Sequence, residues 1–144
     1  MICLLDTNIL IAILREHKLI VLQYKKLTKR QQDKGITSYT IAELYKGVNR
    51  VESLKKMEVQ LKILEILLND FEKRDRIFSL TRKGAVKYAE LKIALEKNGT
   101  PIPIIDLLIG TIAIVNNYKF ITTDKNHFQN LKDVFPNFNV EYWI

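Results

Sequence analysis

The apolar run that opens the chain constrains the fold more than any other segment. Residues 2–5, with the sequence ICLL, lead directly into Asp6, Thr7 and Asn8. A continuous apolar run followed by turn-forming residues is typical of a central strand in a parallel sheet covered on both faces. Open α/β sheets bind ligands at the carboxyl ends of such strands, although Asp6 or Asn8 also suits the N-cap of a following helix. The run therefore predicts a buried strand that ends at a polar edge.

The rest of the chain alternates between helical and extended patterns. The intervals between the expected strands are long enough for crossover helices, which favours an α/β fold with a mostly parallel central sheet. Gly35 is expected to stop the second helix, and the prolines before Asp106 indicate extended backbone there. Strands are predicted at 2–5, 35–38, 76–80, 119–124 and 139–144, and helices at 9–14, 19–34, 38–48, 54–71, 85–97, from about 106, and at 125–131.

Length and composition indicate one domain spanning residues 1–144. A chain of 144 residues with 47% hydrophobic content can bury one core and is too short for two ordinary domains. The single cysteine, Cys3, lies in the first apolar run, so we expect a buried thiol and no intrachain disulfide. The chain shows neither a signal peptide nor a membrane-length apolar span, and we expect a cytoplasmic protein without a membrane partner.

The charge balance points to a polyanionic partner. The formal net charge is +7 and the isoelectric point is near 9.5, which favours nucleic acid through counterion release. Each basic cluster alone is better explained as the solvated face of a helix, and only their sum favours a polyanionic partner. The clusters are Lys25, Lys26, Lys29 and Arg30; Lys46, Arg50, Lys55 and Lys56; Lys73, Arg74 and Arg76; and Arg82, Lys83 and Lys87.

Four acids are expected at one edge of the sheet. Asp6 and Asp124 follow strands, whereas Asp106 and Glu43 lie near the starts of helices. Strand carboxyl ends and helix amino ends share an edge in a parallel sheet, so the four carboxylates are expected to converge. Two alternatives stay open: Glu43 stands three residues after Thr40, which is capping-box spacing, and Asp106 also suits a helix cap.

Converging carboxylates repel one another and therefore require a cation. Oxygen ligands with an incomplete shell suit Mg²⁺ or Mn²⁺, whereas one cysteine and two histidines offer no zinc pattern. Such an ion keeps water molecules that can attack phosphorus, while its charge neutralises a phosphate oxygen. Combined with the basic surface, the pattern predicts hydrolysis of phosphodiester bonds.

Four motifs, in this order, carry a family resemblance. The segments LLDTNIL, TIAELYKG, IPIIDLLIGTIAI and FITTDKNHF resemble the acidic motifs of PIN-domain nucleases, specifically the VapC-type toxins of prokaryotic toxin–antitoxin pairs. The resemblance spans nearly the whole chain. It implies a three-layer α/β/α sandwich, Mg²⁺- or Mn²⁺-dependent endoribonuclease activity on RNA, a cognate antitoxin that covers the site, and a homodimer, which the apolar seam of residues 54–71 also allows.

The resemblance also assigns residues. Asp6, Glu43, Asp106 and Asp124 take the family's catalytic and metal-binding acidic positions, and Asn8 and Thr122 take neighbouring polar positions that contact substrate or support the acids. Asn8 is a departure, because many relatives carry a second acid there. His127 stands where an acid is also common; we interpret it as a surface residue or a local cap and give it no catalytic role.

Two other functions compete with this interpretation. A phosphatase of the haloacid dehalogenase type also begins with an apolar strand that ends in aspartate, but it typically needs a second aspartate where this chain has Asn8. An inactive PIN domain that only binds RNA or a protein is the other alternative. The four acids argue against it.

Overall fold

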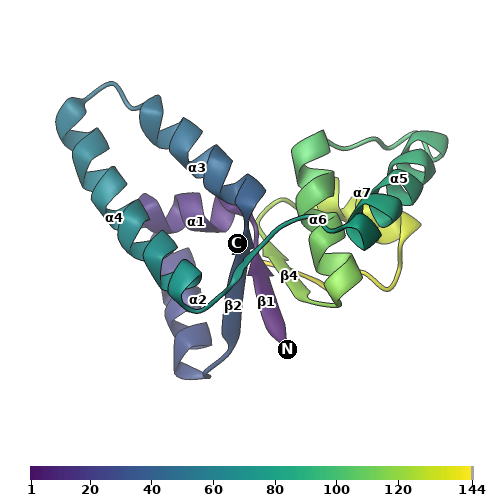
Figure 1. The fold of residues 1–144 in the computed structure, drawn as a ribbon, viewed down its shortest axis with the longest axis horizontal. Coiled ribbons are helices and arrows are strands. Elements are labelled where there is room, and N and C mark those ends of the chain that lie inside the picture. The colour runs from purple at the N-terminus through teal and green to yellow at the C-terminus, as the bar shows by residue number, and fades with distance from the viewer. Residues whose placement is uncertain (144) are drawn as a thin grey trace.

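A single parallel sheet forms the centre of the computed structural model, which describes residues 1–143 (Figure 1). The strand order is β3-β2-β1-β4-β5, and every neighbouring pair is parallel. β1 (Ile2–Leu5) occupies the middle, between β2 (Asp33–Thr37) and β4 (Lys119–Thr122). The opening apolar run is thus the central strand, as predicted. The outer strands are β3 (Ile77–Phe78) and β5 (Val140–Tyr142).

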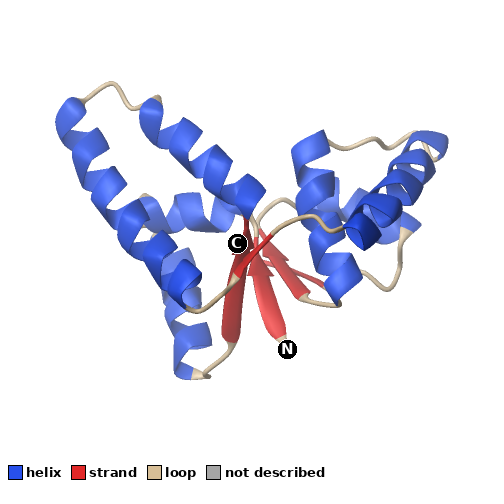
Figure 2. Ribbon diagram, in the orientation of Figure 1, coloured by secondary structure: helices blue, strands red, loops and turns tan. Residues whose placement is uncertain are grey.

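Helices cover both faces of the sheet (Figure 2). Side chains alternate between the faces along each strand, so Leu5 and Ile121 belong to one apolar core while Leu4 and Phe120 belong to the other. The predicted three-layer α/β/α sandwich is confirmed. The first core is covered by α1 (Thr7–Leu14), α2 (Lys18–Lys29), α3 (Ser38–Asn49) and α4 (Leu54–Lys73), and the second by α5 (Arg82–Lys97), α6 (Ile104–Asn116) and α7 (Lys125–Val134).

The predicted end of the second helix is wrong. α2 ends at Lys29, and the chain turns at Gln31, whose φ of 55° lies in the left-handed region. Gly35 lies inside β2 and does not stop a helix. A Cβ at Gly35 would collide with the ring of Phe78 on the neighbouring strand, so close packing between β2 and β3 explains the glycine.

The long helix α4 places only part of its apolar seam in the core. Leu64, Leu68 and Phe71 are buried, whereas Leu54 at the start of the helix is 73% exposed. Cys3 is buried as predicted. Within residues 1–143, every helix is too short or too polar to cross a membrane.

Candidate functional site at the carboxyl edge of the sheet

Asp6 lies at the carboxyl end of β1 and is almost fully buried, with 3% of its surface exposed. Its carboxylate accepts hydrogen bonds from the backbone N–H of Thr7 at 2.8 Å and from the Oγ1 of Thr122 at 2.7 Å. The residue is therefore the N-cap of α1, as the simpler interpretation proposed. Oδ1 of Asp6 caps the helix, while Oδ2 accepts the hydrogen bond from Thr122 at the end of β4.

Thr122 joins the ends of the two central strands. Its buried hydroxyl donates to Asp6 and accepts from the backbone N–H of Asp124 at 3.0 Å. The side chain of Asn8 also reaches it, with Nδ2 at 3.4 Å from Oγ1, while Oδ1 of Asn8 accepts from the N–H of Thr123 at 3.3 Å. Thr122 is fully buried, and its hydroxyl joins the carboxylate of Asp6 to the backbone at Asp124.

Glu43 has no capping role, so the capping-box alternative is wrong. The N-cap of α3 is Thr37, whose hydroxyl accepts from the N–H of Thr40 at 3.1 Å. Glu43 lies one turn further along and accepts a 3.0 Å hydrogen bond from the hydroxyl of Thr7. The hydroxyls of Thr7 and Thr40 are also 3.0 Å apart. A chain of buried hydroxyls thus ties Glu43 to the start of α1.

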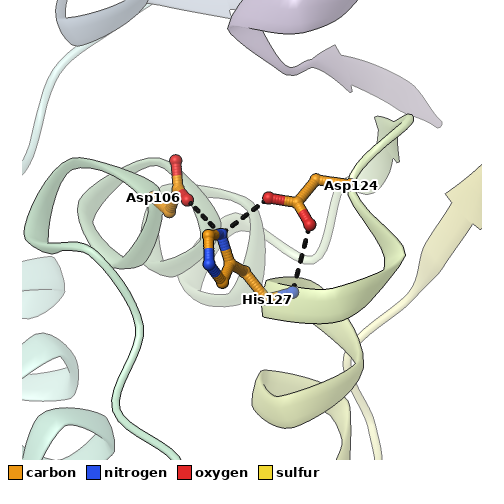
Figure 3. A group of neighbouring side chains, drawn as sticks. All are labelled: Asp106, Asp124 and His127. Atoms are coloured by element: carbon orange, nitrogen blue, oxygen red, sulfur yellow. Dashed lines mark hydrogen bonds and ion pairs between the residues drawn. The ribbon is translucent and has the colours of Figure 1, made fainter.

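Asp106 and Asp124 lie on either side of the His127 ring (Figure 3). Asp106 stands in the first turn of α6, where Pro103 occupies the N-cap position and makes no side-chain cap, so the capping alternative for Asp106 is also wrong. Asp124 is the N-cap of α7 and accepts from the N–H of His127 at 3.1 Å. The Nδ1 of His127 lies 3.0 Å from Oδ2 of Asp106 and 2.7 Å from Oδ2 of Asp124.

Acids from separate segments of the chain affect one another's pKa values. Burial raises the pKa of Asp6 to about 7, and the charges of Asp106 and Asp124 add to this, while the hydrogen bond from Thr122 opposes it. Burial also raises the pKa of Asp106; His127 opposes that shift, and Asp124 and Glu43 reinforce it. The carboxylates therefore lie close enough to repel one another, which makes the edge receptive to a cation.

The tightest donor group differs from the one that the sequence predicted. Ligand atoms of Asp106, Asp124 and His127 lie within 4.8 Å of one another, whereas Asp6 and Glu43 fall outside this group in the part of the chain described. Sequence reasoning missed His127. The available signal was its spacing of three residues from Asp124, which places both side chains on one face of the first turn of α7.

The donors fit a divalent cation. Carboxylate oxygens are preferred ligands of Mg²⁺ and Mn²⁺, and the pKa of Asp106 is raised by burial and, to a smaller extent, by the charges of Asp124 and Glu43. The side chains of Asp106 and Asp124 remain 23% and 27% exposed, so an ion has access to them. The site is therefore open to solvent.

Fold and site together define an α/β protein with a candidate cation site at the carboxyl edge of its sheet. The model of the family described as PIN domain matches residues 3–134. The chain therefore belongs to the PIN-domain family.

The most informative relatives are VapC proteins. The chain is 33% identical over 143 residues to Ribonuclease VapC2 of Rickettsia felis, covering 99% of this chain and 98% of that protein. The crystal structure of VapBC2 from Rickettsia felis bound to a promoter DNA fragment has a TM-score of 0.78 at 28% identity, with both chains fully covered. FitAcB from Neisseria gonorrhoeae has a TM-score of 0.79 at 27% identity, covering 90% of this chain and 93% of that one. The predicted resemblance to VapC-type PIN proteins is confirmed.

Proposed function

We propose that this chain is an endoribonuclease that hydrolyses RNA phosphodiester bonds with Mg²⁺ or Mn²⁺ and acts as the toxin of a toxin–antitoxin pair. The observation that carries the proposal is the convergence of Asp6, Asp106 and Asp124, from three separate segments, on one edge of the sheet with raised pKa values for Asp6 and Asp106. Similarity to Ribonuclease VapC2 supports RNA as the substrate.

Asp106 and Asp124 would hold the cation, and Asp6 and Glu43 complete the acidic edge. When bound, such an ion neutralises charge on a phosphate oxygen and lowers the pKa of a bound water molecule. Thr122 and the N–H of Thr7 hold the carboxylate of Asp6 in place.

Glu43 is suited to receive a proton. The hydroxyl of Thr7 fixes its Oε1 at 3.0 Å, and its side chain is only partly buried, so water can reach the carboxylate. A positioned carboxylate near the scissile phosphate accepts the proton that an attacking water loses. Thr7 links two of the acids, because its N–H donates to Asp6 and its hydroxyl donates to Glu43.

The proposed substrate is RNA whose target segment is unpaired. A net charge of +7 attracts the phosphate backbone without reading its sequence, so affinity should fall as salt rises. The acids lie at a partly buried edge, which a scissile phosphate has to approach closely. A looped strand bends to reach this edge, whereas a stiff A-form duplex resists.

The test uses the purified chain and an RNA hairpin with a single-stranded loop. We expect cleavage in the loop with Mg²⁺ or Mn²⁺, 5′-phosphate and 3′-hydroxyl ends, no cleavage in excess chelator, and a folded but inactive Asp106→Asn variant. Products with 2′,3′-cyclic phosphate, or full activity in chelator, would contradict the assignment of the acids. Tight RNA binding without cleavage would favour the inactive PIN alternative.

The proposal includes a cytoplasmic location and two partners, a cognate antitoxin and a second copy of the chain. VapBC2 of Rickettsia felis, a similar structure, is a complex bound to promoter DNA, and we extend a partner of that kind to this chain. On α4, Leu54 and Ile66 are 73% and 71% exposed and offer apolar surface to another subunit. Co-expression with the product of the adjacent reading frame, followed by light scattering of the purified material, tests both partners.

A further inference from the structure

His127 adds a nitrogen donor to an edge that is otherwise built from carboxylates. We propose that the Nδ1 of His127 is a metal ligand together with Asp106 and Asp124, and that this nitrogen shifts the preference of the site from Mg²⁺ toward a transition-metal ion such as Mn²⁺. The inference rests on the proposed function only in that both require a cation at this edge.

The spacing of the three donor atoms supports direct coordination. An octahedral ion with ligands at about 2.1 Å holds adjacent ligand atoms about 3.0 Å apart. The Nδ1 of His127 lies 3.0 Å from Oδ2 of Asp106 and 2.7 Å from Oδ2 of Asp124. Figure 3 shows the ring directed between the two carboxylates. Both nitrogen–oxygen separations therefore match those of adjacent ligands in one coordination shell, and the three ligand atoms all lie within 4.8 Å of one another.

The start of α7 holds the ring in this position. Asp124 accepts from the N–H of His127, so the cap and the candidate ligand are fixed to each other. The next residue, Phe128, is fully buried and packs against Phe120 of β4 with 4.6 Å between ring centroids. Because Phe128 anchors the buried side of the helix, His127 is directed toward Asp106 on α6. The histidine side chain itself is 41% exposed, so replacing it should not disturb the core.

The chemistry of the donor explains the expected selectivity. Neutral imidazole is a good ligand for first-row transition metals, whereas Mg²⁺ favours carboxylate, carbonyl and water oxygens. Asn8, the second residue of α1, is neutral and adds no charge to attract Mg²⁺. A site formed by one imidazole nitrogen and two carboxylates should therefore bind Mn²⁺ more tightly than Mg²⁺.

The chain allows an unambiguous test because it has only two histidines, His17 and His127. His17 caps α2, with Nδ1 at 3.4 Å from the N–H of Ile20, and has no place in the donor group. Pulsed electron paramagnetic resonance of the Mn²⁺-loaded protein should reveal a directly coordinated nitrogen-14 nucleus in the wild type. The signal should persist in His17→Gln and disappear in His127→Gln, with circular dichroism verifying that both variants are folded.

Metal affinity provides the second measurement. Mn²⁺ titration monitored by paramagnetic resonance, with Mg²⁺ as competitor, gives both dissociation constants. We expect His127→Asp, which restores an all-oxygen site, to reduce the preference for Mn²⁺ over Mg²⁺ by about tenfold or more. His17→Gln should leave the preference unchanged.

The outcomes separate this inference from the proposed function. Bound Mn²⁺ without nitrogen coupling, in a protein that cleaves RNA, would overturn the role of His127 and leave the nuclease standing. Nitrogen coupling that is lost in His127→Gln, in a protein that never cleaves RNA, would overturn the nuclease alone. Failure to bind Mn²⁺ would overturn both the histidine ligand and the proposed metal dependence, and nitrogen coupling that survives in His127→Gln would overturn the assignment of the ligand.

Discussion

The two edges of the sheet shift the pKa values of their aspartates in opposite directions. At the carboxyl edge, burial and the charges of neighbouring acids together raise the pKa values of Asp6 and Asp106. At the amino edge Asp33, the first residue of β2, binds Arg76 through two nitrogens at 2.9 and 2.7 Å, and this lowers the pKa of Asp33.

Opposite charges are paired at the amino edge, whereas negative charges gather at the carboxyl edge. Paired charges at the amino edge stabilise the folded chain modestly, because both partners are partly exposed. Gathered carboxylates at the carboxyl edge oppose folding until a cation binds, since each is partly or wholly withdrawn from water. Stability and the candidate activity are therefore assigned to opposite ends of the same strands.

Asp6→Asn should produce the largest effect. We expect RNA cleavage to fall by roughly 10²–10³-fold, as expected for loss of a major electrostatic contribution, while the metal-free protein melts at a higher temperature. The amide has nearly the same volume as the carboxylate and its oxygen can keep one of the two hydrogen bonds that Asp6 accepts, so we expect the fold to be retained. Cleavage kinetics and thermal melts in chelator measure the two effects. A variant that loses both activity and stability would show that the Asp6 carboxylate does not oppose folding.

The pH dependence of stability should differ in sign between the edges. In the folded, metal-free protein the pKa of Asp6 is about 7, against 3.8 ordinarily, so the folded state binds more protons than the unfolded state between these values. The free energy of unfolding should therefore fall by up to about 4 kcal/mol as pH rises from 4 to 7. Asp33 has a lowered pKa and contributes stability that is lost only as pH falls below about 4.

Urea denaturation in chelator across this pH range measures the effect. The curve for Asp6→Asn should decline less steeply than that of the wild type, because the variant has no proton to release at this position. Parallel curves for the two proteins would show that burial of Asp6 is not the source of the slope.

Thr122→Val should have an intermediate effect at the carboxyl edge. The substitution preserves shape but removes the hydroxyl that donates to Asp6 and accepts from the N–H of Asp124. Leaving these groups unpaired costs about 1–3 kcal/mol, and we expect cleavage to fall about tenfold or more. Thr122→Ser, which keeps the hydroxyl, is the matched control and should recover most of both losses. Equal behaviour of the valine and serine variants would exclude a positioning role for the hydroxyl.

The smallest effect is expected at the amino edge. Asp33→Asn removes the ion pair with Arg76 and should lower the melting temperature slightly, because the side chain of Asp33 is 39% exposed. RNA cleavage and metal affinity should match the wild type. A change in either would show that the two edges are energetically coupled through β2.

The sequence was most informative where one local rule determined the outcome. Asp6 and Asp124 could be placed at one edge because each follows an apolar run, and parallel strands end together. The position of Glu43 was predicted, but the capping role that its spacing from Thr40 suggested was wrong, because Thr37 at the end of β2 caps α3. Composition alone does not reveal which of Thr37, Ser38 and Thr40 caps the helix.

Errors arose where tertiary contacts decide. Gly35 has the sequence signature of a helix stop, yet its small size serves the contact with Phe78 on the next strand. His127 meets Asp106, 21 positions away, only when α7 packs beside α6, so this contact has no local signature. Side-chain contacts between helices depend on rotation about their axes, which the packing of residues such as Phe128 sets.

The hydrogen bond from Thr122 to Asp6 also has a consequence for the timing of synthesis. Its partners lie 116 residues apart in the chain. At translation rates of about 5–20 residues per second, roughly 6–23 s separate the appearance of the first carboxylate from that of the hydroxyl that holds it. A nascent chain therefore carries β1 without its β4 neighbour for most of its production. Ribosome-bound chains that end before β4 should not cleave RNA. An interval therefore separates the start of synthesis from the first active copy.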